Sequence, residues 1–193
     1  MIDKKVIIYN APPNSGKDVA AQLPKPVSTR HVEFKNKLIE LTCVIYSVTR
    51  QYFDSIYTRE LKDTPMDFLF GLSPRQALIK VSEECIKPNY GADYFGKALA
   101  TNIDKINAPY FECSDGGFAL EIPPLYEIIK PENLLIVRVY RSGCDYIGDS
   151  RSYIHPQDVH PLTKVIDLYN NSTLVNYKNT VSSIALRFFQ SAE

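Results

Sequence analysis

The stretch that decides the fold runs from residue 6 to residue 18 and reads Val6-Ile7-Ile8-Tyr9-Asn10-Ala11-Pro12-Pro13-Asn14-Ser15-Gly16-Lys17-Asp18. A short β-branched run that ends in a turn cluster is typical of a buried parallel strand. Residues 19–23 continue as a short helical pattern, which Pro24 ends. The stretch therefore predicts a strand, a tight loop and a helix, in that order.

The loop between this strand and helix has the character of a phosphate-binding loop. The pattern Gly-x4-Gly-Lys-Ser/Thr surrounds phosphate oxygens with backbone N–H groups and the N-terminus of a helix, and Gly16-Lys17 is intact. Ala11 stands where the first glycine is usual, and Asp18 stands where Ser or Thr would bind magnesium. The alternative is a plain strand-to-helix turn with one exposed lysine. We predict a nucleotide-binding loop made of Ala11, Asn14, Ser15, Gly16, Lys17, Asp18 and Val19.

Strand and helix patterns alternate along the rest of the chain. Further strands are expected near residues 30–34, 110–113, 134–140 and 165–168, and helices near residues 36–48, 74–85, 92–103, 123–129 and 174–188. This alternation predicts βαβ units and a mostly parallel sheet within one domain, residues 1–193. Residues 142–161 are rich in Gly, Ser, Asp and Pro, and we expect them to form a mobile loop.

Composition restricts the classes of function. The chain has 193 residues, with 22 basic and 22 acidic side chains and a formal net charge of zero. This balance argues against a protein whose main task is to grip a nucleic-acid backbone, although it allows a local basic groove. The cysteines are widely spaced, which favours reduced thiols in a cytoplasm over a zinc site or a disulfide framework. Apolar runs are too short to cross a bilayer, so we expect no membrane partner.

Several motifs along the chain resemble those of one known family. The first is Asn14-Ser15-Gly16-Lys17-Asp18, which resembles the Ser-Gly-Lys-Asp loop of the phage-type deoxynucleoside monophosphate kinases. Four later segments agree with that family in order and spacing: Ser73-Pro74-Arg75-Gln76, Gly91-Ala92-Asp93-Tyr94-Phe95, Asp115-Gly116-Gly117-Phe118-Ala119-Leu120-Glu121 and Ile166-Asp167-Leu168-Tyr169-Asn170-Asn171-Ser172-Thr173-Leu174. The match covers almost the whole chain. One departure is clear, because the family's arginine two positions after the aspartate is Gly117 here.

The resemblance implies the P-loop nucleotide-kinase fold, an α/β architecture with a five-stranded parallel sheet in the order 2-3-1-4-5 flanked by helices. It also implies an acceptor-binding helical segment over about residues 35–105, a lid over about residues 142–161, and ATP with Mg²⁺ as the phosphoryl donor. A homodimer is a further expectation, and the location would be the cytoplasm, or the host cytoplasm if the protein is viral.

Phosphoryl transfer needs positioning and positive charge, and this need suggests catalytic roles. We expect Lys17 to contact the β- and γ-phosphates, and Arg141 and Arg151 to close on the phosphates from the lid. Asp115 follows a strand at the edge where ligands bind in open parallel sheets, so it is a candidate base or magnesium ligand; its alternative role is a turn-forming aspartate. Asp18 is the second candidate magnesium ligand, acting through a bound water.

Other residues are candidates for binding the substrates. Arg75 opens a helix on the acceptor side, Gly116 and Gly117 allow close approach, and Phe34 and Tyr94 offer rings for a base. Core packing is the alternative for the aromatic residues. Asn170 is expected near the adenine by family resemblance, and it also reads as part of a helix cap.

Three functions remain open from the sequence. The first is a kinase that phosphorylates a deoxynucleoside monophosphate, whose acceptor group needs no general base. The second is a kinase acting on a hydroxyl of a modified base, such as 5-hydroxymethyluracil in phage DNA; here Asp115 would be the base, and the missing arginine at position 117 favours this acceptor. The third is a nucleotide-binding module without catalysis, which Ala11 and Asp18 would permit.

Overall fold

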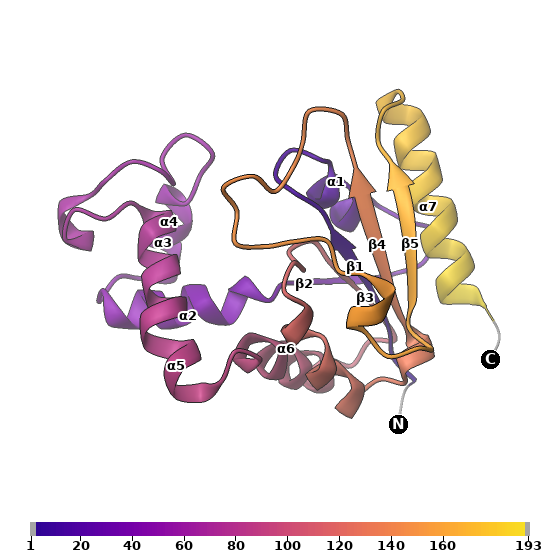
Figure 1. The fold of residues 1–193 in the computed structure, drawn as a ribbon, viewed down its shortest axis with the longest axis horizontal. Coiled ribbons are helices and arrows are strands. Elements are labelled where there is room, and N and C mark those ends of the chain that lie inside the picture. The colour runs from indigo at the N-terminus through magenta and orange to yellow at the C-terminus, as the bar shows by residue number, and fades with distance from the viewer. Residues whose placement is uncertain (1–2, 192–193) are drawn as a thin grey trace.

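Five parallel strands form the single sheet of the described chain, which is a computed structural model covering residues 3–191. The strands are β1 (Lys5–Asn10), β2 (Arg30–Val32), β3 (Tyr110–Cys113), β4 (Leu134–Tyr140) and β5 (Lys164–Tyr169). Their order is β2-β3-β1-β4-β5, and every neighbouring pair is parallel. The predicted α/β fold and its 2-3-1-4-5 strand order are confirmed (Figure 1).

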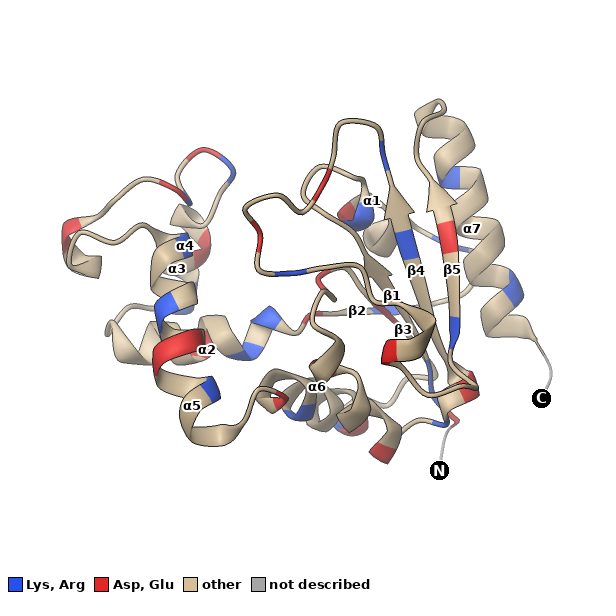
Figure 2. Ribbon diagram, in the orientation of Figure 1, with Lys and Arg blue, Asp and Glu red and all other residues tan. Residues whose placement is uncertain are grey.

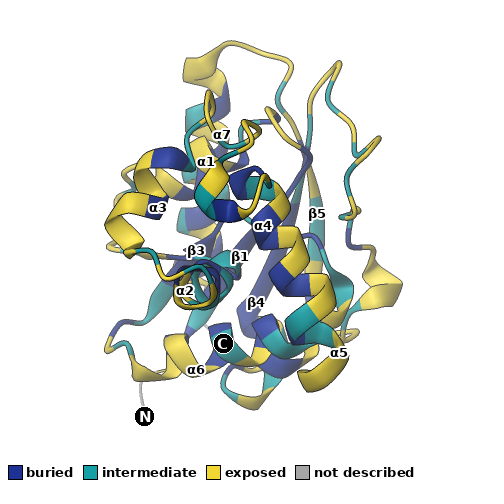
Figure 3. Cartoon of the chain, turned by 90° about the vertical axis from the view of Figure 1, so that its left-hand side faces the viewer, coloured by how far each residue is buried: buried dark blue, intermediate teal, exposed yellow. Residues whose placement is uncertain are grey.

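Helices cover both faces of the sheet, and this explains the unbroken apolar run of β1. Val6 and Ile8 pack with α6 (Tyr94–Lys105), whereas Ile7 and Tyr9 pack on the other face. The helices of that second face are α1 (Lys17–Gln22) and α7 (Leu174–Gln190). A strand that is buried on both faces has no solvent side, so its residues need not alternate in polarity. Figure 3 shows the buried positions concentrated on the strands and on the inner sides of the helices.

The predicted acceptor segment forms a helical lobe beside the sheet (Figure 1). Its elements before α6 are α2 (Lys35–Ile45), α3 (Arg50–Ile56), α4 (Pro74–Lys80), the π-helical turn η2 (Val81–Ile86) and α5 (Lys87–Tyr90). The start expected at Ser73-Pro74 is confirmed, because Ser73 accepts a hydrogen bond from the Gln76 amide and Pro74 occupies the first turn. Small apolar clusters hold the lobe together, separate from the two cores of the sheet.

Two predicted helices were wrong in detail. The long helix expected over residues 36–48 ends at Ile45, because Ser47 adopts a left-handed φ of 53° and Thr49 then caps α3. The helix expected over residues 123–129 is instead a 3₁₀ segment, η4 (Pro123–Glu127). Pro131 disfavours a helical conformation of the residue before it, and Lys130 is extended with a ψ of 143°, so the segment has little room for a longer helix. Further 3₁₀ turns are η1 (Asp67–Leu69), η3 (Ala119–Glu121), η5 (Pro131–Asn133) and η6 (Pro156–Asp158).

The loop of residues 142–161, called the lid loop below, is fastened to the sheet near its base. Asn10, the fully buried last residue of β1, donates to the carbonyl of Ser152 and to the hydroxyl of Tyr146, both at 3.0 Å. Its own side-chain oxygen accepts from the Ile154 amide at 2.8 Å. Because Asn10 also donates to the carbonyl of Gly116, the lid loop and the end of β3 share one anchor. Within residues 3–191, no helix is long and apolar enough to cross a membrane.

Candidate functional site

The predicted phosphate loop adopts a turn that needs two left-handed residues. Asn14 has a φ of 65° and Gly16 has a φ of 101°. Gly16 leaves no room for a side chain, because a Cβ there would lie 2.6 Å from Nδ2 of Asn170. Ala11 is not among the positive-φ residues, and its methyl group is buried in the core beside α1. The departure from glycine at position 11 is therefore compatible with the loop conformation.

Three side chains hold successive carbonyl groups of this loop. Arg141 Nη1 donates to the carbonyl of Asn14 at 3.0 Å, Asn170 Nδ2 to that of Ser15 at 2.8 Å, and the Tyr177 hydroxyl to that of Gly16 at 3.1 Å. In a planar trans peptide the N–H points away from the preceding C=O. Fixing the carbonyls thus turns the amides of residues 15–17 toward the opposite side, where an anion would be received. Asn170 and Arg141, both predicted site residues, thus lie at the loop. Tyr177 was not predicted, because its spacing is that of an ordinary buried residue of the closing helix.

Lys17 is placed inside the loop. It is 7% exposed, and its ammonium donates to the Pro12 carbonyl at 3.1 Å. Burial lowers the pKa of Lys17, and the positive charges of Arg151 and Lys35 lower it further, whereas Asp18 acts in the opposite direction. An additional negative charge would offset this penalty.

The other side chains at the loop differ in burial and in their contacts. The Ser15 hydroxyl is fully buried and has no hydrogen-bond partner in the described part of the chain. Asp18, a predicted magnesium ligand, is exposed in the first turn of α1, as is Val19. Arg59, which comes from the loop after α3, reaches across from the helical lobe and donates to Oδ1 of Asn14 at 2.7 Å.

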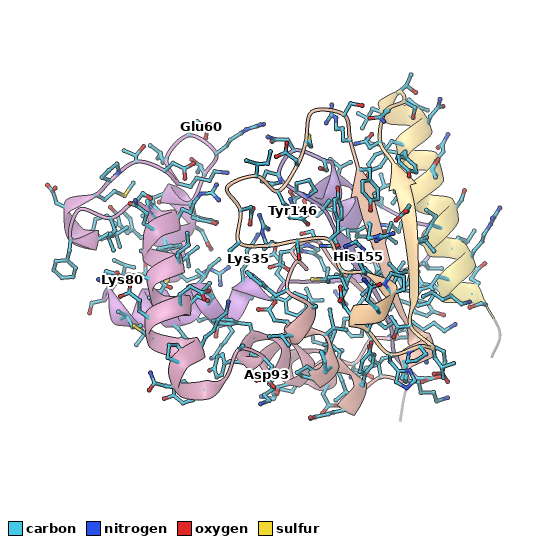
Figure 4. The ribbon with its side chains drawn as sticks, in the orientation of Figure 1. Lys35, Glu60, Lys80, Asp93, Tyr146 and His155 are labelled. Carbon is cyan, nitrogen blue, oxygen red and sulfur yellow. The ribbon has the colours of Figure 1, made fainter. Side chains whose placement is uncertain are left out.

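A cavity of about 190 Å³ lies between the helical lobe and the lid loop, and we call it the lobe cavity. Its lining residues are Phe34, Lys35, Leu38, Tyr57, Arg75, Leu78, Ile79, Ser82, Glu83, Phe95, Asp115, Phe118, Glu121, Asp149, Ser150 and Arg151. Figure 4 shows Lys35 at the start of α2, between the lobe and the lid loop. The lobe supplies Ser82 and Glu83 from the π-helical turn η2, a distortion that is frequent at functional sites.

Three cations line the lobe cavity, and two of them were predicted. Arg75 pairs with Asp63 at 2.6 Å. Burial opposes the charge of Lys35, but the carboxylates of Asp115 and Glu33 outweigh it, so the pKa of Lys35 is raised. Arg151 is the third cation. The positive charges of Lys35 and Arg151 also lower the pKa of Lys17, and Arg59 of the lobe bonds to Asn14, so the loop and the lobe are neighbours.

Arg151 is held by its own lid loop. Its Nε and Nη2 contact the two carboxylate oxygens of Asp149 at 2.9 and 2.6 Å. This bidentate pair raises the pKa of Arg151 and lowers that of Asp149. Acidic and basic positions follow one another along the lid loop where it faces the lobe (Figure 2). The guanidinium is thus kept at the cavity in a fixed orientation.

The stem of Arg151 occupies the space above Gly117. A Cβ at position 117 would lie 2.7–2.8 Å from the Cβ, Cγ and Cδ atoms of Arg151. The amide of Ser152 donates to the Gly117 carbonyl at 3.1 Å and fixes this contact. Glycine at 117 and arginine at 151 therefore belong together: the lid loop brings a guanidinium where residue 117 can carry no side chain. Gly116 is equally crowded, since its Cβ would lie 2.3 Å from Ile8.

Asp115, predicted as a base or metal ligand, lines the lobe cavity and holds the start of α2. Oδ1 accepts from the Phe34 amide at 3.0 Å and Oδ2 from the Lys35 amide at 2.9 Å. The thiol of Cys113 is also 3.0 Å from Oδ1. Because both oxygens accept hydrogen bonds, this carboxylate positions Phe34 and Lys35 at the cavity wall.

The structure does not bring every predicted substrate residue to one place. Tyr94 lines a second cavity of about 470 Å³ between α2 and α6, and it is absent from the lining of the lobe cavity. Phe34 lines both. Glu121 and Asp149 line the lobe cavity but were not predicted. Glu121 is the last residue of a family-like motif, which could have drawn attention to it, whereas nothing in the local sequence distinguishes Asp149.

Comparisons with known proteins add little to this description. No protein-family model matches the sequence, and no curated protein matches it. Among solved structures, one match is the crystal structure of TT1252 from Thermus thermophilus, with 11% sequence identity and a TM-score of 0.45. The match covers 94% of this chain and 96% of that chain. The fold assignment rests on the strand order and register described above.

Proposed function

We propose that this protein is a kinase that transfers the γ-phosphoryl group of ATP to the phosphate of a deoxynucleoside monophosphate. The observation that carries the proposal is that the loop around Lys17 contacts the helical lobe through Arg59, and that the lobe borders a cavity lined by three cations and four aromatic rings. Phosphoryl transfer is catalysed mainly by positioning and positive charge, and both are supplied where the loop and the cavity meet.

On the donor side, the loop amides and the ammonium of Lys17 would bind the β- and γ-phosphates of ATP. The ammonium would leave the Pro12 carbonyl and exchange one weak neutral acceptor for phosphate oxygens. Arg141 already donates to the loop at Asn14, and its guanidinium has further N–H groups for phosphate. The buried hydroxyl of Ser15, which has no hydrogen-bond partner within residues 3–191, is a further group that a bound nucleotide could satisfy.

On the acceptor side, Lys35, Arg75 and Arg151 would hold the phosphate of the monophosphate. One of its oxygens attacks the γ-phosphorus, the bond from that phosphorus to the β,γ-bridging oxygen breaks, and ADP leaves with that electron pair. The attacking oxygen carries no proton near neutral pH, so the reaction needs no base. This agrees with Asp115, whose two oxygens accept hydrogen bonds from the start of α2.

The residues near the loop could hold Mg²⁺ only together with the phosphates of a bound nucleotide. Among residues 3–191, no group of three or more His, Cys, Asp or Glu side chains forms a ready metal site. Mg²⁺ commonly keeps several waters and binds through substrate phosphates with one or two carboxylates. Asp18, which is exposed beside the loop, would be such a carboxylate. When bound, the ion would neutralise charge on the ATP phosphates.

The acceptor hydroxyl of a modified DNA base is the weaker reading of this site. It was favoured by the missing arginine at position 117, but the stem of Arg151 fills that position. It also requires Asp115 as a base, and that carboxylate is engaged with α2. Both features favour a monophosphate acceptor.

The proposal is tested by incubating the protein with Mg²⁺, γ-labelled ATP and each deoxynucleoside monophosphate in turn. We expect label on at least one free nucleotide, and we expect Lys17→Ala to lower turnover by about a thousandfold or more, because transition-state charge would lose its nearest cation. Lys164→Ala is the matched control, since Lys164 is an exposed lysine on β5, and its removal should leave turnover unchanged.

A parallel incubation with DNA that contains 5-hydroxymethyluracil separates the acceptors. Label on DNA alone would replace the monophosphate by the hydroxyl acceptor. If neither acceptor is labelled and ATP does not raise the melting temperature, the kinase proposal fails. ATP binding without transfer to either acceptor would leave a non-catalytic nucleotide-binding module.

A further inference from the structure

The carboxyl group of Glu121 is buried next to a leucine that is not. Glu121 is 3% exposed, whereas Leu120 is 64% exposed. The backbone of Glu121 packs tightly against α6, because a Cβ at Gly96 would lie 2.2 Å from the carbonyl oxygen of Glu121. This contact holds η3 with Glu121 on its buried side and Leu120 on its exposed side. Burying an ionisable group in place of an apolar one costs free energy, so stability gives no reason for the arrangement.

The carboxyl of Glu121 has no hydrogen-bond partner among residues 3–191. Glu112, the other buried glutamate among residues 3–191, differs in this respect. Glu112 accepts hydrogen bonds from Tyr9, Lys25 and Thr29, at 2.8, 2.7 and 3.0 Å. Glu112 is therefore part of the fold's own polar network, whereas Glu121 leaves its hydrogen-bonding capacity unused and lines the lobe cavity.

The charges that face Glu121 come from four elements. They are Asp115 after β3, Glu83 on η2, Lys87 on α5 and Arg151 in the lid loop. Both cations are engaged elsewhere: Lys87 Nζ lies 2.6 Å from Glu83 Oε1, and Arg151 Nη2 lies 2.6 Å from Asp149 Oδ2. Burial, reinforced by the Asp115 carboxylate, raises the pKa of Glu121 to about 8. The group is therefore mainly a neutral acid at pH 7.

The rest of the lobe cavity suits a flat, partly polar ring. Its aromatic lining residues are Phe34, Tyr57, Phe95 and Phe118. Lys87 lies over the ring of Phe118 at 4.2 Å and stiffens that wall. Aromatic and apolar walls with a few convergent polar groups are the usual surroundings of a bound small molecule.

We propose that Glu121 binds the nucleobase of the acceptor, as a neutral carboxylic acid that donates one hydrogen bond to the base edge and accepts one from it. The inference rests on the proposed kinase function, and it adds the group that recognises the base to the cations that hold the phosphate. A base edge that presents a donor beside an acceptor satisfies both oxygens of the acid at once. An acceptor without a base leaves the acid unsatisfied and loses that contribution.

The test compares Glu121→Ala and Glu121→Gln with two acceptors. One is the deoxynucleoside monophosphate that the wild type uses best, and the other is 2-deoxyribose 5-phosphate, which carries the same phosphate without a base. Glu121→Ala should lower kcat/KM for the nucleotide by about 10- to 100-fold, the usual effect of removing a buried hydrogen-bonding pair. The KM for ATP and the weak use of 2-deoxyribose 5-phosphate should not change.

The glutamine variant distinguishes base recognition from a purely structural role. Its amide donates and accepts one hydrogen bond in the geometry of the neutral acid, so nucleotide use should stay within about threefold of the wild type. The KM of the wild type for the nucleotide should rise above about pH 8 as Glu121 ionises, and that rise should be absent in Glu121→Gln. If Glu121→Ala impairs both acceptors equally, the proposal is overturned and Glu121 is structural.

Binding measurements keep this test apart from the test of catalysis. If the wild type transfers phosphate to no acceptor, the kinase proposal fails, and calorimetric titration with each monophosphate still examines Glu121. Tighter binding of a nucleotide than of 2-deoxyribose 5-phosphate, abolished in Glu121→Ala and kept in Glu121→Gln, supports base recognition. Equal binding of the two ligands by the wild type rejects it.

Discussion

The phosphate loop and the lobe cavity are built in opposite ways. The loop is a short continuous stretch, residues 11–17, whose shape depends on backbone conformations and on three side chains that hold its carbonyls. The lobe cavity is assembled from α2, α4, η2, η3, the end of β3 and the lid loop, and its character depends on side chains far apart in sequence. Under the proposed function, donor binding would be specified by a local stretch of sequence, whereas acceptor choice would be specified by how distant segments pack together.

The largest expected effect is the free-energy cost of burying the carboxyl group of Glu121 in the lobe cavity. Folded Glu121 keeps its proton to about pH 8, whereas an unfolded glutamate loses it near pH 4.5. The stability that the neutral acid contributes is therefore complete below pH 4.5 and is lost as the pH rises to 8. Relative to the wild type, Glu121→Gln should gain stability over this window, by at most about 5 kcal/mol. Denaturant unfolding of both proteins at pH 5, 7 and 9 measures the gain, and a difference that does not vary with pH would contradict it.

The next largest effect is expected from removing either of the two arginines of the lid region, which should affect different substrates. Arg151 faces the lobe cavity and Arg141 donates to the loop at Asn14. Arg151→Ala should lower kcat by about a thousandfold and raise the KM of the acceptor, with little change in the KM of ATP. Arg141→Ala should instead raise the KM of ATP and spare the acceptor. Steady-state kinetics with each substrate varied decides the matter, and the same pattern in both variants would show that the two regions do not work separately.

The same contrast explains what the sequence predicted and what it did not. The alternating strands and helices, the loop and Ser73 as a helix cap were predictable, because apolar periodicity, Gly16-Lys17 and a Ser-Pro pair each act through neighbouring residues. The strand order was predicted only through the family resemblance, because strand order depends on contacts between distant segments. The break at Ser47 was missed, since its apolar neighbours keep a helical spacing on both sides of the turn. Glu121 and Asp149 were missed because their positions at the cavity depend on packing between segments that no local pattern records.

A smaller effect is expected from exchanging the two residues that share one space, Gly117 and Arg151. Gly117→Ala should displace the stem of Arg151 and lower kcat about tenfold, because a Cβ at 117 would lie 2.7–2.8 Å from that stem. Gly117→Arg should be worse in the wild-type background than combined with Arg151→Ala, where the space is free. Turnover of the double variant above that of Arg151→Ala alone would show that a guanidinium from either segment serves the cavity.

Additive losses in the double variant would contradict that interpretation. They would mean that residue 151 acts through the lid loop itself, for example through its pair with Asp149, and that the guanidinium has no equivalent position on residue 117. Melting temperatures of all the variants separate this outcome from simple unfolding.

The smallest expected effect is on the phosphate loop, where one hydroxyl can be removed without touching the lobe cavity. Tyr177→Phe deletes the hydrogen bond to the Gly16 carbonyl and keeps the ring, which is buried between α7 and the loop. One such bond is worth about 1 kcal/mol, so the KM of ATP should rise about three- to fivefold while the KM of the acceptor stays constant. Tyr169→Phe is a matched control, because Tyr169 is an exposed tyrosine on β5. Tyr177 does not line the lobe cavity. If Tyr177→Phe raises the KM of the acceptor as much as the KM of ATP, the loop and the cavity do not act separately.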